Sequence, residues 1–197
     1  MNLPNRLTLA RIALVPVVMI FILYRPFGEG TYFWSALTAA ALFLIATVTD
    51  FFDGHIARKR NMSTDFGKLM DPIADKFLTI GALIAFAGSE MYADIRWLTV
   101  WAAAIVFFRE LGVTSLRLIA NTSEGLVISA AFIGKLKTVF QSVAIMTLIL
   151  EPYLITAHFG TVPYLLTYIT MGIMLLLTVI SGVLYFKDHW AYINPKG

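Results

Sequence analysis

The sequence predicts an all-α integral membrane protein: a bundle of six transmembrane helices forming a single domain over residues 1–197. The first observation is composition, with 59% hydrophobic and only 14% charged residues, whereas soluble domains average about 25% charged. The mean hydropathy is +0.79. A soluble fold of this length could not bury so much apolar surface, so lipid must cover part of it. The second observation is a series of six apolar runs, each near the about 20 residues that cross a bilayer.

The apolar runs follow one another with polar punctuation between them. They lie at roughly 8–24, 33–52, 67–88, 95–117, 132–150 and 162–186. The first run has no convincing small-residue cleavage site before Arg25, so we expect a retained helix rather than a cleaved signal. There is no cysteine, which excludes disulfides and cysteine ligands.

Basic residues predict the orientation of the bundle. With the N-terminus in the cytoplasm, the outer segments hold only Arg25 and Arg96, and every other Lys and Arg falls on the inner side. Both termini are therefore expected in the cytoplasm. The pI of about 9.2 suits a surface facing anionic membrane lipid. The charges form no continuous basic arm, so nucleic acid is not an expected partner. Without a Ser- and Arg-rich leader, a bacterial plasma membrane is favoured over an organelle.

Carboxylates gather where the second run ends and the third begins. On a helix that turns about 100° per residue, one face of the second run carries Asp50, Asp53, Gly54, Ala57 and Arg58. One face of the third carries Gly67, Asp71 and Asp75, spaced four residues apart. A short turn between the runs would bring both faces to one cavity.

Such a cluster requires compensation, because a carboxylate at membrane depth costs about 2.5–3.5 kcal/mol. Hard divalent cations with oxygen ligands, Mg²⁺ or Mn²⁺, supply it best, and paired metals serve phosphoryl chemistry. For any single aspartate the alternative is a solvated charge or a helix cap, which fits Asp65 in the turn.

The spacing of these residues resembles the signature of the CDP-alcohol phosphotransferase family. The matching pattern is Asp50-x-x-Asp53-Gly54-x-x-Ala57-Arg58 followed by Gly67-x-x-x-Asp71-x-x-x-Asp75. The resemblance implies transfer of a phosphatidyl or related group from a CDP-linked donor to an alcohol, with release of CMP. It implies that the four aspartates hold two divalent metals and that Asp75 is also the general base. It further implies a CDP site lined by Gly54, Ala57, Arg58 and Gly67, and a homodimer.

The opening PNRLTLAR also resembles that family, with Asn5 and Thr8 in the matching positions. We expect a short interfacial segment that lies along the membrane and closes over the nucleotide. The alternative is an ordinary helix start, with Asn5 or Thr8 as cap and Arg11 as a topology charge.

Further charges interrupt the later runs and predict a phosphate-bearing acceptor. Arg109, Arg117, Lys135 and Lys137 lie toward the cytoplasmic side, where cations at membrane depth favour an anion. The alternatives are an ion pair of Arg109 with Glu110 inside the bundle, and a positive-inside flank for the lysines. FFRELGVTSLR and GKLKT resemble the branch of the family that joins CDP-diacylglycerol to sn-glycerol 3-phosphate.

Three other functions stay open. Within the family, a cardiolipin synthase or a phosphatidylinositol phosphate synthase would use a different acceptor. From another class, a divalent-cation transporter also carries acidic residues in its membrane helices. A transporter should place them near the bilayer midplane, whereas here they gather at one end.

Overall fold

A computed structural model describes residues 3–24, 26–28, 30–59, 65–124, 132–154 and 162–188. This part of the chain contains α-helices and one 3-10 helix, and no strand. In chain order the elements are α1 (Leu3–Leu23), α2 (Tyr32–Lys59), α3 (Asp65–Gly88), η1 (Glu90–Ile95), α4 (Arg96–Glu124), α5 (Phe132–Leu154) and α7 (Leu165–Asp188). The all-α prediction is confirmed, and each of the six apolar runs corresponds to one α-helix.

The helices are long and apolar enough for a membrane bundle. Within the described residues, five windows have the length and hydropathy of a membrane span. The remaining helix, α3, has a shorter apolar stretch among its described residues, Lys76–Gly88. Two helices run about two turns past their apolar runs, because helical structure continues into the charged residues: α2 to Lys59 and α4 to Glu124.

The N-terminal segment differs from its prediction. Leu3–Leu23 is one continuous helix, so PNRLTLAR forms the first turns of α1 and is not a separate segment before it. Pro4 does not prevent this, because the first N–H groups of a helix have no partner within the helix to lose.

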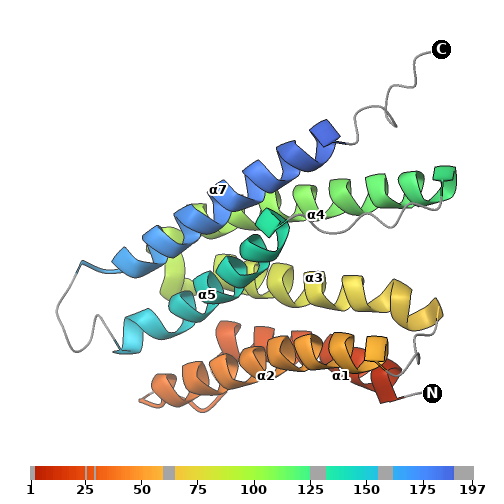
Figure 1. The fold of residues 1–197 in the computed structure, drawn as a ribbon. Coiled ribbons are helices and arrows are strands. Elements are labelled where there is room, and N and C mark those ends of the chain that lie inside the picture. The colour runs from red at the N-terminus through yellow and green to blue at the C-terminus, as the bar shows by residue number, and fades with distance from the viewer. Residues whose placement is uncertain are drawn as a thin grey trace.

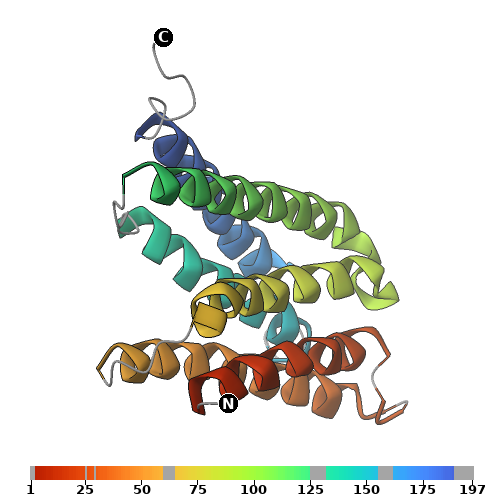
Figure 2. The ribbon, with the colours of Figure 1, turned by 90° about the vertical axis from the view of Figure 1, so that its right-hand side faces the viewer.

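Successive helices alternate in direction, so the start of α1 and the end of α7 lie at the same end of the bundle (Figure 1). We call this end, where α2 and α4 finish and α3 and α5 begin, the motif end; the opposite one is the far end. A quarter turn shows α1 and α2 on one side, α4 and α7 on the other, and α3 between them (Figure 2). The buried hydrophobic core lies between the packed helices and includes Phe43, Leu83, Phe86, Ile145 and Met171.

At the far end, polar side chains form hydrogen bonds with backbone groups of neighbouring helices. The carboxylate of Glu151, at the end of α5, accepts hydrogen bonds from the N–H groups of Leu166 (2.8 Å) and Thr167 (2.6 Å) at the start of α7. The hydroxyl of Tyr164, a residue with φ of +61°, donates to the carbonyl of Met91 in η1 at 3.1 Å. Glu151 therefore satisfies helix N–H groups that have no partner within α7.

Candidate active site

The backbone of the motif end carries the predicted metal-binding sequence. Asp50, Asp53, Gly54, Ala57 and Arg58 lie in the last turns of α2, and Gly67, Asp71 and Asp75 lie in the first turns of α3. Their side chains lie outside the described part of the structure. Among the side chains that are described, no three acidic or histidine residues cluster as metal ligands. The role of the four aspartates as metal ligands therefore stays a prediction. Their backbone positions are near the end of α2 and the start of α3.

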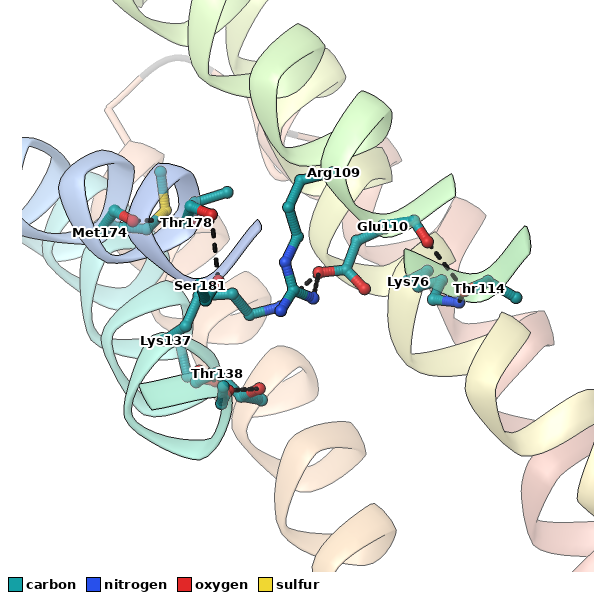
Figure 3. Close-up of polar contacts among 11 residues, drawn as sticks. Lys76, Arg109, Glu110, Thr114, Lys137, Thr138, Met174, Thr178 and Ser181 are labelled. Carbon is teal, nitrogen blue, oxygen red and sulfur yellow. Dashed lines mark hydrogen bonds and ion pairs between the residues drawn. The ribbon is translucent and has the colours of Figure 1, made fainter. Parts of the chain in front are cut away.

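A network of charged side chains centres on Glu110 of α4 (Figure 3). Its Oε1 accepts a hydrogen bond from Arg109 Nη1 at 3.0 Å and another from the ammonium group of Lys137 on α5. All three side chains are largely buried, and Lys137 is only 4% exposed. The ion pair of Arg109 with Glu110 that the sequence left open is thus present within α4, and Lys137 of α5 extends it to a second helix.

The network also reaches the helix that carries Asp71 and Asp75. Lys76 of α3 donates to the hydroxyl of Thr114 on α4, and that hydroxyl donates to the carbonyl oxygen of Glu110 at 2.8 Å. Because Lys76 directly follows Asp75 in α3, this contact fixes the cations of α4 and α5 beside the predicted catalytic helix.

Positive charge exceeds negative charge among the described side chains of this network. Lys76, Arg109 and Lys137 contribute three cations, whereas Glu110 contributes one carboxylate. In addition, Arg109 Nε is buried and has no hydrogen-bond partner. A buried donor without a partner is costly, and a guanidinium suits a phosphate in fork geometry. The guanidinium of Arg109 can therefore receive an anion.

Of the other predicted acceptor residues, only the side chain of Lys135 is described, and it is not part of this network. Lys135 is exposed on α5, on a different face from Lys137 because the two are two residues apart. Arg117 lies in α4, and its side chain lies outside the described part. Sequence analysis missed Thr114, its contact with Lys76 and the bridging role of Glu110. The four-residue spacing of Glu110 and Thr114 was the one available signal.

The first turns of α1 lie close to the motif half of α2. Thr8 and Arg11 are buried, and Arg11 Nε donates to the carbonyl oxygen of Ala46 at 3.2 Å. Ala46 lies one turn before Asp50. Arg11 is therefore more than a topology charge, because it ties α1 to α2 beside the aspartates. The side chain of Asn5 lies outside the described part.

Comparison with known proteins gives a consistent result. A family model described as CDP-alcohol phosphatidyltransferase matches residues 1–184. The CDP-diacylglycerol–glycerol-3-phosphate 3-phosphatidyltransferase of Bacillus subtilis (strain 168) is 38% identical over 197 residues, covering 96% of this chain and 95% of that protein. The probable phosphatidylglycerophosphate synthase of Mycobacterium tuberculosis (strain H37Rv) is 43% identical over 184 residues, covering 93% of this chain and 79% of that protein.

Proposed function

This chain belongs to the CDP-alcohol phosphatidyltransferase family, and from that premise we propose that it transfers the phosphatidyl group of CDP-diacylglycerol to sn-glycerol 3-phosphate. The products are phosphatidylglycerophosphate and CMP, in phospholipid biosynthesis. The observation that carries the choice of acceptor is the buried Arg109–Glu110–Lys137 network beside α3. Two relatives that each cover more than nine-tenths of this chain support the same reaction: the name of one includes glycerol 3-phosphate, and the name of the other includes phosphatidylglycerophosphate.

In the proposed reaction, a hydroxyl of glycerol 3-phosphate attacks the β-phosphorus of CDP-diacylglycerol. A new P–O bond forms to the acceptor oxygen, the P–O bond to CMP breaks, and Asp75 takes the hydroxyl proton. Arg109 and Lys137 hold the acceptor phosphate, and Lys135 and Arg117 are the further residues proposed to bind it. Holding donor and acceptor together makes the attack effectively unimolecular.

The donor's nucleotide would lie between α1 and the motif turns of α2 and α3. The residues proposed to line it are Asn5, Thr8, Gly54, Ala57, Arg58 and Gly67. The Arg11 contact with Ala46 supports this placement, because it keeps Thr8 close to α2. Glycine and alanine leave the backbone open to close approach by a phosphate.

Two divalent cations, Mg²⁺ or Mn²⁺, fit the donor set of the motif end. α2 and α3 bring Asp50, Asp53, Asp71 and Asp75 to adjoining helix ends, and carboxylate oxygens are the ligands that these hard cations prefer. When bound, the cations would neutralise the pyrophosphate and stabilise the leaving CMP.

The motif end is proposed to face the cytoplasm of a bacterial cell membrane, with both termini on that side. The basic residues of the sequence gather at this end of the helices, as the positive-inside rule requires. The water-soluble acceptor and CMP would then exchange with the cytoplasm. A homodimer is proposed from the family resemblance alone.

The test is CMP release by detergent-purified protein given CDP-diacylglycerol and Mg²⁺, with and without glycerol 3-phosphate. We expect release that depends on glycerol 3-phosphate and stops with EDTA. Release only with phosphatidylglycerol or inositol phosphate would instead identify a cardiolipin synthase or a phosphatidylinositol phosphate synthase. Metal uptake into proteoliposomes without CMP release would identify a divalent-cation transporter.

A further inference from the structure

The side chain of Arg109 leaves α4 through a space that depends on glycines of two other helices. Its stem lies against Gly182 of α7, where an added Cβ would come within 3.2 Å of Arg109 Cγ. Its tip faces Gly134 of α5, where an added Cβ would lie 3.9 Å from Arg109 Nη2. Gly182 is buried.

Most other glycines within the described helices allow apolar packing. An added Cβ at Gly81 would meet Val15, one at Gly88 would meet Leu23, and one at Gly112 would meet the ring of Phe186. Gly172, ten residues before Gly182 in α7, faces open space. Gly182 and Gly134 differ from all of these because the neighbouring side chain is charged.

We propose that Gly182 is a positioning residue for the acceptor site, because its bare backbone fixes the path of the Arg109 side chain. This inference rests on the proposed function. Along this path, Arg109 Nη1 lies 3.0 Å from Glu110 Oε1. The buried Nε has no hydrogen-bond partner in the protein, and the acceptor phosphate would accept its hydrogen bond. α7, which carries none of the aspartates, thereby contributes to acceptor recognition.

Arg109 has little freedom to accommodate a methyl group at position 182. A contact of 3.2 Å is closer than carbon atoms normally approach, since their optimum separation is about 3.5–4.0 Å. The stem would have to move by a few tenths of an ångström. Its far end is held by Glu110, which in turn is held by Lys137. The displacement would therefore reorient the guanidinium and not simply slide it outward.

The test compares Gly182→Ala with two matched controls under saturating CDP-diacylglycerol and Mg²⁺. We expect Gly182→Ala to raise the KM for glycerol 3-phosphate about three- to tenfold, because misplacement by about 1 Å can cost about a hundredfold. The KM for CDP-diacylglycerol should not change. Gly172→Ala introduces the same methyl group into open space and should leave both constants unchanged. Gly112→Ala disturbs the same α4–α7 contact through Phe186 and should produce no selective rise for glycerol 3-phosphate.

A double-mutant cycle with Arg109→Ala tests whether Gly182 acts through Arg109. If it does, Gly182→Ala adds nothing to the KM of the Arg109→Ala protein, because the Cγ atom it displaces is absent. An additional rise in that background, an equal rise for both substrates, or loss of folding in both backgrounds would overturn the inference. Wild-type protein that fails to use glycerol 3-phosphate would instead overturn the proposed function, so the two failures are distinguishable.

Discussion

Among the described side chains, each end of the bundle has one glutamate that is largely buried, and the two have opposite kinds of partner. At the far end, Glu151 is 1% exposed and accepts hydrogen bonds from two backbone N–H groups of α7. At the motif end, Glu110 accepts from Arg109 and Lys137, two cationic side chains from α4 and α5.

The partners determine what each carboxylate can do. The N–H groups beside Glu151 belong to a fixed helix start, so that carboxylate joins α5 to α7 and offers nothing to a substrate. Glu110 holds Arg109 and Lys137 in place, and the buried Arg109 Nε, which has no hydrogen-bond partner, can donate to a second anion. Burial alone would not separate the two roles. The predictions below test the contrast between the two ends.

The largest effect should come from the proposed base at the motif end. We expect Asp75→Asn to lower kcat for CMP release by about 10²–10⁴-fold, the usual contribution of a general base, and to keep some nucleotide binding. Binding of a CDP analogue and the thermal unfolding midpoint in detergent should stay near wild type. A wild-type rate in this variant would remove Asp75 from the mechanism.

Glu110→Gln should affect both activity and stability. Glutamine keeps an acceptor oxygen for Lys137 but loses the charge between two buried cations. We expect kcat/KM for glycerol 3-phosphate to fall about ten- to a hundredfold through misplacement of Arg109 and Lys137. The free energy of unfolding should fall by about 3 kcal/mol, the lower end for breaking a buried ion pair. Full activity per folded molecule would show that Glu110 is only structural.

The two ends also differ in how much could be predicted from sequence. Hydropathy located the long α-helices of the described residues, because each apolar run is near the length that spans a bilayer. It did not locate η1, because the segment GSEMYAD at residues 88–94 has the polar residues typical of a loop. In the structure, Tyr92 of this segment packs edge-on against Phe86, with ring centroids 4.9 Å apart. Helix ends were also missed where charged residues continue the helix, as in the last turns of α2.

Side-chain partners depend on helix register, which a single sequence does not give. Glu110 and Lys137 are 27 residues apart, and their pairing requires a particular offset between α4 and α5. The partners of Glu151 were likewise not predictable, because its carboxylate accepts from backbone N–H groups at the start of the next described helix, α7. The aspartate pattern was recognisable because its members are on two consecutive helices with regular spacing.

Glu151→Gln makes the matched substitution at the far end. Glutamine offers one carbonyl oxygen where the carboxylate offered two, so one of the N–H groups of Leu166 and Thr167 loses its acceptor. We expect a loss of about 1–2 kcal/mol in the free energy of unfolding, as for a lost helix cap. KM values and kcat per folded molecule should be unchanged. A selective change in the KM for glycerol 3-phosphate would erase the proposed difference between the two glutamates.

The smallest effect should come from an ion pair at the far end that is open to solvent. Arg96 Nη2 lies 3.0 Å from Glu90 Oε1, and the two side chains are 42% and 91% exposed. Exposed pairs contribute about 0.2–1 kcal/mol, because water screens the charges and ordering long side chains costs entropy. Glu90→Gln should therefore shift the thermal midpoint less than Glu151→Gln does and leave kinetics unchanged. If the exposed substitution proved as destabilising as the buried one, then the backbone contacts of Glu151 would not be what stabilises the far end, and the contrast with Glu110 would rest on charge alone.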